Sequence, residues 1–356
     1  MVQNGVIVKK RIPWIDVSKG WAMILVFWGH LSGNGDNPWF PDLITSKKVV
    51  YYFHMPLFFI LSGLTFHADG SFKEFVTKRV RRLLIPYYFF SLYGLGKVVL
   101  SIINPKAIDS FHGELITSPI AQIIEILFGY QGLWFFWALF WGELVLYWIY
   151  RCCKKYLPLI AAASSLMWFY CGTCNTGFAY IIKLFPFFFY TVFQALAFVS
   201  IGILISDFLK SLDRVGALQM LLVSGVMFSL LSTLLLVYKQ DGMQKSVPAI
   251  MAAIVGSLFV VAFSILQKKL ATIEYIGRNT IVFYGLNGFS IATARAVFFK
   301  IIPVSIIAEN VYLQVVAGVI IVIVSCVICW LATLIINRWL WMCIGMPRPM
   351  RKEMVV

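Results

Sequence analysis

Charged side chains are scarce in this chain. Lysine, arginine, aspartate and glutamate together make up only 13% of the 356 residues, with 15 acids against 30 bases. Soluble domains carry about a quarter charged residues. Hydrophobic residues reach 61%, and the mean hydropathy is +0.86. The composition therefore excludes an ordinary soluble domain and predicts an integral membrane protein.

Basic stretches with interleaved aromatic residues are missing outside the apolar segments. Such stretches are typical of nucleic-acid binding, so we expect no nucleic-acid partner. The net charge of +15 is instead explained by cytoplasmic loops, in which Lys and Arg accumulate in membrane proteins. A cleavable signal peptide is also missing, because the first apolar segment contains Asp16 and Lys19 and lacks a small-residue cleavage pattern. We interpret this segment as a retained first helix.

The seven cysteines include two CxxC pairs, Cys171/Cys174 and Cys326/Cys329. A zinc site would need both pairs close together in a polar pocket. Each pair lies within or at the end of an apolar segment, so we predict no metal site and interpret these cysteines as small buried residues. A disulfide between Cys171 and Cys174 is the alternative.

Long apolar segments recur along the whole chain and predict an all-α, polytopic transmembrane bundle, with residues 1–356 forming one integral-membrane domain. A spanning helix needs about 20 mostly apolar residues. We expect ten spans, at about 14–33, 49–68, 83–103, 131–150, 157–174, 178–206, 215–238, 247–267, 279–301 and 311–337. Pro186 is expected to kink the long sixth span. The stretch 119–129 is too short to span and is interpreted as a re-entrant or interfacial helix.

The distribution of basic residues predicts the orientation of the bundle. One set of loops and termini holds Lys9, Lys10, Arg11, Lys73, Lys78, Arg79, Arg81, Arg82, Arg151, Lys154, Lys155, Lys210, Arg214, Lys268, Lys269, Arg278, Arg338, Arg348, Arg351 and Lys352. The opposite loops hold only Lys47, Lys48, Lys106, Lys239, Lys245 and Lys300. Because the side richer in Lys and Arg is cytoplasmic, and the span number is even, we expect both termini in the cytoplasm.

The first predicted span reads WIDVSKGWAMILVFWGH at residues 14–30 and contains three ionisable residues, Asp16, Lys19 and His30. Eleven residues make almost three helical turns, so Lys19 and His30 share a face and lie roughly 16 Å apart along the axis. Asp16 lies one turn before Lys19. Ionisable groups inside a membrane usually face the bundle interior or a wet cavity and indicate function. The alternatives are an Asp16–Lys19 pair that anchors the helix end and a neutral His30 bonded to a neighbouring helix.

The second predicted span, VVYYFHMPLFFILSGLTF at residues 49–66, carries His54 and Ser62. Only four histidines occur in the chain, and two of them, His30 and His54, fall inside spans that should be adjacent. Since histidine titrates near neutral pH, the pair indicates a proton-handling site.

A basic cluster follows in FVTKRVRRLLIPYYFF at residues 75–90. One interpretation is a positive cytoplasmic flank. The other is a cytoplasmic mouth that binds phosphate, because the guanidinium fork of arginine matches phosphate oxygens.

These three segments resemble the first three helices of the acyltransferase 3 family. Within it they are most similar to the branch of small acetyltransferases that modify bacterial surface polysaccharides, including the fucose acetylase-like proteins. GLWFFWALF at 132–140 resembles the next Trp-Phe segment of the family, and YIGRNTIVFYGLNG at 275–288 resembles its late G-x-x-S/T-x-x-x-Y helix. The resemblance covers the whole chain in order.

The resemblance implies an O-acyltransferase of the bacterial cytoplasmic (inner) membrane. Such enzymes take an acyl group, usually acetyl, from cytoplasmic acyl-CoA and place it on a hydroxyl of a surface polysaccharide or lipid-linked glycan. Acetyl-CoA is then a substrate, and no permanently bound cofactor is expected. The family often has an Arg, ten residues and a His in the first helix; here these positions are Lys19 and His30. Where many members have a late His, this chain has Asn287, which can hydrogen-bond but cannot carry a proton.

Our mechanistic hypothesis makes His30 the general base for the acceptor hydroxyl. A covalent acyl-His30 intermediate is the alternative. His54 would orient His30 or hold the acceptor, and Ser62 would donate to the oxyanion or simply pack the helix. The predicted donor-binding residues are Lys19, Arg79, Arg81 and Arg82. The predicted acceptor-binding residues are Asp16, Ser62, Glu143, Asn287 and Arg295, with Glu143 and Arg295 either paired with each other or lining the acceptor path.

Two other functions fit the same residues. One is a proton-coupled transporter or flippase for a glycan or lipid precursor, in which Lys19, His30 and Arg295 would couple proton movement. The chain shows no internal repeat, which disfavours a transporter. The other is a non-catalytic partner of a polysaccharide synthase. Dependence on acyl-CoA separates the enzyme from both.

Overall fold

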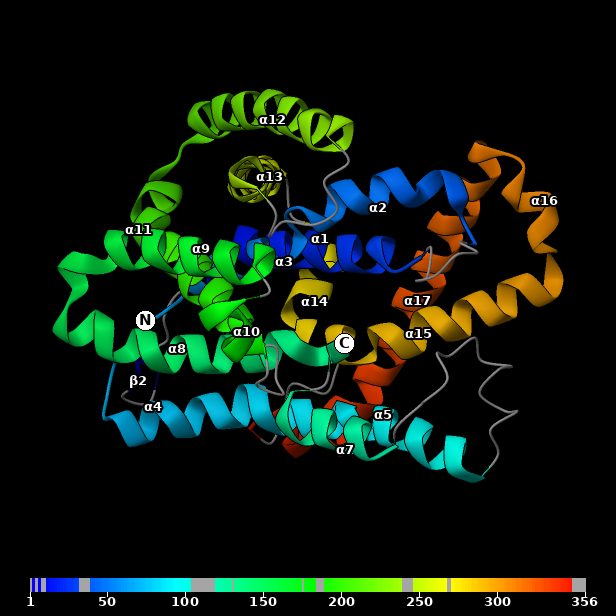
Figure 1. Ribbon diagram of the computed structural model, residues 1–356, viewed down its shortest axis with the longest axis horizontal. Helices are drawn as coiled ribbons and strands as arrows, with labels where there is room; N and C mark the ends of the chain where they lie inside the picture. Colours follow the sequence, from blue (N-terminus) through cyan, green and yellow to red (C-terminus); the bar gives the residue numbers. More distant parts are fainter. Residues whose placement is uncertain are drawn as a thin grey trace.

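The computed structural model describes residues 2–3, 6–7, 11–31, 39–103, 119–129, 131–174, 176–183, 189–238, 246–267 and 270–347. Helices form nearly all regular structure in these ranges (Figure 1). The exception is a short antiparallel pair of strands near the N-terminus, β1 (Val2–Gln3) and β2 (Val6–Ile7). The predicted helical class is therefore confirmed, with this small addition.

Six helical segments in the described part of the chain are long and apolar enough to cross a membrane. They are Phe72–Leu100, α11 (Tyr190–Ser211), α12 (Arg214–Val237), α13 (Val247–Leu266), α15 (Thr280–Ile301) and α17 (Val311–Trp339). The first joins α4 (Phe72–Arg79), a π-helical turn η2 (Val80–Leu84) and α5 (Ile85–Ile103) without a break. The predicted third span therefore begins about ten residues earlier than expected, and the basic cluster lies within a helix.

The other predicted spans are shorter or interrupted. Helices α1 (Pro13–Gly29) and α9 (Leu157–Thr173) have 17 residues each, and α8 (Trp134–Cys152) has 19, including several Trp and Tyr residues. Among the described residues, six helices have the length and hydropathy of a membrane span. The number of ten spans is therefore not tested and stays a prediction. The sixth predicted span divides into α10 (Gly177–Lys183) and α11; Pro186, the expected kink, lies outside the described residues.

The second predicted span is broken between α2 (Ile44–Tyr51) and α3 (His54–Leu64). Pro56 lies in the first turn of α3, where its missing N–H costs no intrahelical hydrogen bond. A helix start at His54 therefore accommodates the proline, and the interruption places His54 at the N-terminus of α3.

Short helices connect and cover the long ones. They are η1 (Pro41–Leu43), α7 (Pro119–Phe128), η3 (Gln131–Leu133), η4 (Lys154–Tyr156), α14 (Ala271–Arg278), α16 (Val304–Ala308) and η6 (Trp341–Ile344). Helix α7 is the short helix expected at 119–129. It packs beside α5, where the Tyr87 hydroxyl donates to the Ile126 carbonyl over 2.7 Å. Its position relative to a membrane stays a prediction.

Helix α1 lies in the middle of the bundle and packs against α3, α13, α14 and α15 (Figure 1). Its contact with α14 is unusually close. A Cβ at Gly20 would lie 2.1 Å from the Ile273 carbonyl oxygen, and one at Gly277 would lie 1.7 Å from the Asp16 carbonyl oxygen. Only glycine permits this backbone approach. The contact fixes the start of α15, which follows α14 directly, beside the N-terminal half of α1.

Candidate functional site

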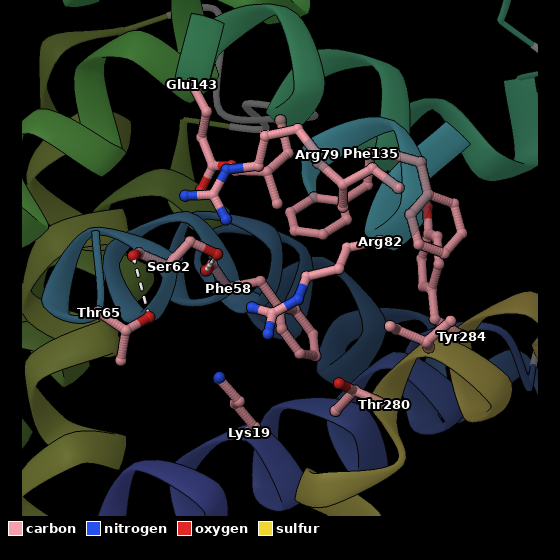
Figure 2. Close-up of a pocket in the computed structure, with 14 residues that line it drawn as sticks. Lys19, Phe58, Ser62, Thr65, Arg79, Arg82, Phe135, Glu143, Thr280 and Tyr284 are labelled. Atoms are coloured by element: carbon pink, nitrogen blue, oxygen red, sulfur yellow. Dashed lines mark hydrogen bonds and ion pairs between the residues drawn. The ribbon is translucent and has the colours of Figure 1, made fainter. Parts of the chain in front are cut away.

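A cavity of about 260 Å³ lies among α1, α3, α8, the start of α15 and the α4–η2 segment (Figure 2). Polar side chains meet in it from all of these elements: Lys19, Ser62, Thr65, Arg79, Arg82, Glu143, Thr280 and Tyr284. Its apolar lining consists of Phe58, Leu83, Phe135, Phe136, Leu139 and Ile281. The structure thus brings together five residues that the sequence singled out on four separate segments: Lys19, Ser62, Arg79, Arg82 and Glu143.

The cavity has an excess of positive charge. Lys19 and Arg82 extend into it from facing helices, and neither forms an ion pair with another described residue (Figure 2). Arg79 Nε lies 2.6 Å from Glu143 Oε2, and these side chains are only 16% and 5% exposed. The Arg79 guanidinium also lies over the Phe75 ring, 4.6 Å from its centroid. Three cations against one carboxylate leave two positive charges, which suits an anion with phosphate groups.

Arg81, the third predicted donor-binding arginine, does not line the cavity. It is exposed, and its carbonyl lies against Gly345, where a Cβ would be 1.7 Å from the Arg81 oxygen. The π-helical turn η2 contains Arg81 and Arg82 and directly follows Arg79. Arg79 and Arg82, which are three positions apart, line the cavity, whereas Arg81 does not. The predicted role of Arg81 is therefore not supported by its position.

Ser62 lines the cavity, but its hydroxyl proton is engaged. The hydroxyl donates to the Phe58 carbonyl over 2.9 Å, and Thr65 donates to the Ser62 carbonyl over 3.2 Å. A serine has one O–H donor. Donation to an oxyanion would therefore require Ser62 to give up its bond to Phe58.

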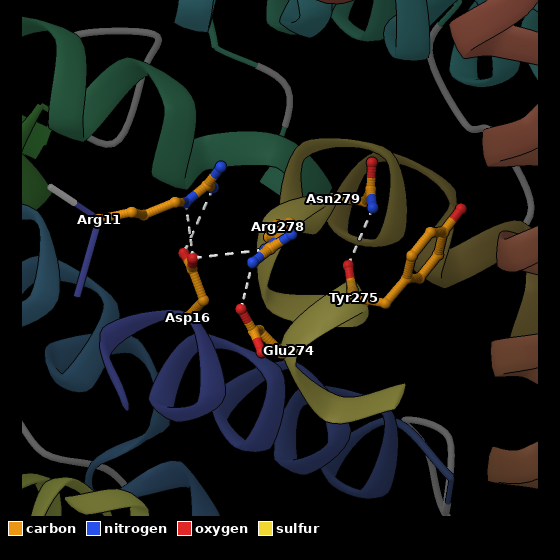
Figure 3. A network of polar contacts seen from close by, with 6 residues as sticks. All are labelled: Arg11, Asp16, Glu274, Tyr275, Arg278 and Asn279. Carbon is orange, nitrogen blue, oxygen red and sulfur yellow. Dashed lines mark hydrogen bonds and ion pairs between the residues drawn. The ribbon is translucent and has the colours of Figure 1, made fainter. Parts of the chain in front are cut away.

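Asp16 is placed outside the cavity, in a polar network that joins α1 to α14 (Figure 3). Its carboxylate pairs with Arg11 Nε at 2.7 Å and lies 3.7 Å from Arg278 Nε, while Arg278 also binds Glu274. The alternative interpretation, an Asp16–Lys19 ion pair, is not observed, because Asp16 pairs with Arg11 and Arg278. The position of Asp16 favours a structural role at the helix end over contact with substrate.

The two histidines of the spans lie near the opposite end of α1. Tyr51 lies between them, with its ring centroid 6.0 Å from that of His30 and 4.8 Å from that of His54. We call His30, Tyr51 and His54 the histidine cluster. His30 Nδ1 donates to the Val26 carbonyl at 2.8 Å, and His54 Nδ1 donates to the Val50 carbonyl at 2.9 Å.

These bonds determine which ring nitrogen can act as a base. A carbonyl oxygen only accepts, so each Nδ1 carries the proton and, in the neutral imidazole, each Nε2 keeps its lone pair. The two imidazoles form no hydrogen bond with each other. The prediction that His54 orients His30 directly is thus not supported; their contact runs through the Tyr51 ring.

Arg295 and Glu143 do not meet, so their predicted pairing is wrong. Glu143 binds Arg79 in the cavity, whereas Arg295 Nη1 donates to the Leu31 carbonyl over 3.0 Å. The Arg295 guanidinium lies over Trp39, 4.7 Å from the ring centroid. Arg295 therefore belongs to the histidine end of the bundle, where it holds the residue after His30.

Asn287 lies on α15 between Thr280, which lines the cavity, and Arg295, at the histidine end of the bundle. Its side chain is buried, and its Oδ1 accepts no hydrogen bond from the described residues. An unsatisfied buried acceptor is costly, so this oxygen is available to a donor from a ligand, as the predicted positioning role requires.

Aromatic side chains form part of the cavity wall. Phe135 packs against Phe58 with centroids 5.8 Å apart and against Tyr284 at 5.7 Å. The aromatic lining therefore gives the cavity an apolar wall beside its cations.

Thr280 and Tyr284 were not predicted as site residues, although a signal for them exists. They are the S/T and Tyr of the G-x-x-S/T-x-x-x-Y pattern at 277–284, and both line the cavity. That spacing of four residues places two polar groups on one helix face. Tyr51 and Trp39 carried no comparable signal, because their importance comes from contacts between distant segments.

The sequence profile of the Acyl_transf_3 family, described as an acyltransferase domain, matches residues 12–334 of this chain. The chain belongs to the acyltransferase 3 family. The predicted resemblance is confirmed, and the protein is a multi-pass membrane acyltransferase by its family and by the hydropathy of its helices.

A curated relative adds a partial match. The chain is 34% identical over 133 residues to the nodulation protein NolL of Sinorhizobium fredii (strain NBRC 101917 / NGR234), a match that covers 35% of this chain and 32% of NolL. The chain thus matches only about a third of the length of this relative. No solved structure matches the chain significantly.

The cysteines and acids do not assemble into a metal centre within the described residues, where no group of three or more His, Cys, Asp or Glu side chains could hold an ion. Cys171 and Cys329 are buried, and Cys174 and Cys326 are partly buried, so the CxxC cysteines largely pack as predicted.

Proposed function

We propose that this acyltransferase is an O-acetyltransferase of the bacterial inner membrane and consists of one integral-membrane domain. It transfers acetyl from cytoplasmic acetyl-CoA to a hydroxyl of a surface polysaccharide or lipid-linked glycan. The observation that carries the proposal is the layout along α1. The cationic cavity lies at Lys19, and His30, about 16 Å farther along the helix axis, lies beside His54; each of the two imidazoles has a basic Nε2.

The cavity has the positive charge that the phosphates of the donor require. Lys19, Arg79 and Arg82 present ammonium and guanidinium donors to phosphate oxygens. The aromatic lining then offers an apolar path for the thioester arm toward the histidine cluster. In the proposed ten-span topology this cavity opens to the cytoplasm, where acyl-CoA is made.

His30 acts as the general base in this proposal. Its Nε2 takes the proton of the acceptor hydroxyl while the hydroxyl oxygen attacks the thioester carbonyl. The C–S bond then breaks, the CoA thiolate leaves, and the proton from His30 returns to the sulfur. The bond from Nδ1 to the Val26 carbonyl fixes the tautomer that this step needs and stabilises the imidazolium.

The acceptor approaches from the histidine end. His30 is exposed there, and Arg295 and Asn287 on α15 provide polar groups along the same side of the bundle. The similarity to family members that modify bacterial surface polysaccharides supports a glycan acceptor. Family membership also favours acyl transfer over the transporter and the non-catalytic partner.

A transfer assay in membranes tests this function. Inside-out vesicles containing the wild type, His30→Ala or His67→Ala receive acetyl-labelled acetyl-CoA, and label in glycan and lipid is measured. His67 is the matched control because it is an exposed histidine after α3, outside the cluster. We expect label transfer by the wild type and His67→Ala, and a loss of at least about a hundredfold in His30→Ala, as for other general bases.

Two results would contradict the proposal in different ways. Equal transfer by the wild type and His30→Ala would remove His30 from the mechanism. No transfer by any folded variant, with the native glycan present, would exclude acetyl-CoA as the donor for that glycan.

A further inference from the structure

We propose that Glu143 is an exchangeable counter-ion, which holds Arg79 in the empty cavity and yields it to the donor phosphate when the donor binds. The inference concerns regulation of the anion site, and it rests on the proposed function for the identity of the anion. Glu143 would thereby set how tightly the donor binds and how fast the used carrier leaves.

The first argument is the position of the carboxylate inside the binding space. Both members of the Arg79–Glu143 pair line the cavity, together with Lys19 and Arg82, which form no ion pair with a described residue (Figure 2). Arg79 Nε contacts the Glu143 carboxylate directly at 2.6 Å, and Lys19 and Arg82 line the same cavity. The carboxylate therefore lies among the same cations that a phosphate of the donor would contact.

The second argument is that Arg79 does not depend on Glu143 for its position. Its guanidinium lies over the Phe75 ring at 4.6 Å and near the Phe66 ring at 6.0 Å. Cation–π contacts attract a guanidinium independently of its ion pair and so help to retain its position. A phosphate can therefore replace Glu143 as the partner of Arg79 while the arginine side chain stays in position.

The third argument is charge balance. A buried guanidinium without a partner is costly, so an empty cavity needs an internal anion beside Arg79. A phosphate dianion satisfies Arg79 better than a carboxylate, but it must also tolerate the nearby negative charge of Glu143. This repulsion limits donor affinity and favours release of the CoA product, since both carry the same phosphates.

The proposal predicts opposite effects on binding and turnover. Glu143→Gln keeps the size of the side chain and removes its charge, which raises the cavity charge from an excess of two to three positive charges. We expect about tenfold tighter binding of CoA, because the substitution removes the repulsion between the Glu143 carboxylate and the CoA phosphates. At a distance of a few ångströms near the protein surface, such a repulsion is large enough to change an equilibrium constant about tenfold. The KM for acetyl-CoA and kcat should both fall, because product release becomes slower.

The test uses the full-length protein in lipid nanodiscs, with free CoA and inorganic pyrophosphate as probes, and measures Kd by calorimetry at several salt concentrations. Asp207→Asn is the matched control, since Asp207 is exposed on α11 outside the cavity and its replacement changes the net charge equally. Glu143→Asp keeps the charge on a shorter side chain, and it serves if Glu143→Gln does not fold. It should bind CoA more tightly than the wild type and less tightly than Glu143→Gln.

The outcomes separate this inference from the proposed function. Tighter binding of both probes by Glu143→Gln, with no change in Asp207→Asn, supports the exchange. Unchanged or weaker CoA binding in Glu143→Gln and Glu143→Asp overturns it and makes Glu143 a fixed structural partner. Tighter binding of pyrophosphate in a protein whose wild type does not bind CoA supports the exchange and overturns the proposed donor.

Discussion

At the residue scale, the orientation of the two imidazoles depends on short-range contacts. Each Nδ1 is bound to a carbonyl of the preceding helical turn, so neither ring can present Nδ1 to a substrate. The Tyr51 ring occupies the space between them. Gly29 makes this placement feasible, because a Cβ at that position would lie 2.8 Å from the Tyr51 ring. Tyr51 is therefore a positioning residue for the histidine cluster.

The expected effect of removing the Tyr51 ring is a loss of turnover with little change in donor affinity. Tyr51→Ala leaves a hole in which both imidazoles can rotate, and small displacements of reacting groups cost as much as a hundredfold in rate. We expect kcat to fall by about tenfold or more in Tyr51→Ala and to stay near the wild-type value in Tyr51→Phe, which keeps the ring. Steady-state kinetics with acetyl-CoA measure both.

The control for this experiment is Tyr238→Ala, an exposed tyrosine at the end of α12. A pH–rate profile adds a readout that a merely structural defect would not move, because a displaced general base changes the profile. Wild-type kcat in Tyr51→Ala would show that the ring does not position the imidazoles.

At the scale of elements, the contact between α1 and α14 sets the geometry of the cavity. The two helices touch backbone to backbone at Gly20 and Gly277, and the ion pairs of Asp16 with Arg11 and Arg278 cover this contact (Figure 3). Lys19 precedes Gly20, and Thr280 follows shortly after Gly277. A shift between these helices would therefore move two walls of the cavity apart.

Gly277→Ala should destabilise the protein and weaken donor binding together. Its Cβ would lie 1.7 Å from the Asp16 carbonyl oxygen, so the backbones must separate, at an expected cost of about 1–3 kcal/mol. Gly288→Ala, on the following helix α15, is the matched control, because a Cβ there meets nothing within 4 Å. Melting temperature and CoA affinity of the purified variants measure the effect. A Gly277→Ala protein as stable as Gly288→Ala would show that the contact is not constraining.

The elements also show what the sequence could and could not predict. Apolar runs identified nearly every long helix, because burial in lipid demands them. They did not reveal the break before His54 or the unbroken helix from Phe72, since both depend on local proline chemistry and on packing. The sequence correctly assigned Lys19 and His30 to one helix, with Lys19 in its first half and His30 at its C-cap. The partners of Glu143, Arg295 and Asp16 could not be predicted, because each pairs with a residue on another segment.

At the scale of the whole molecule, the cavity residues share one end of the bundle. Lys19 lies near the start of α1, Thr65 at the end of α3, Arg79 near the start of its span and Thr280 at the start of α15. These are the helix ends that the distribution of Lys and Arg assigns to the cytoplasm. The orientation of the protein in the membrane therefore determines whether cytoplasmic acyl-CoA can reach the cavity. The proposed reaction requires this end of the bundle to face the cytoplasm.

The pair Cys152 and Cys153 offers a direct test of that orientation. Both thiols are exposed at the end of α8, beside the basic residues of η4. A membrane-impermeant maleimide should label them in inside-out vesicles and not in intact cells. Peptide mass spectrometry locates the label, and the Cys152→Ser/Cys153→Ser variant shows that the signal comes from this pair. Labelling in intact cells would place this end outside, where no acyl-CoA is available, and would contradict the topology and the donor together.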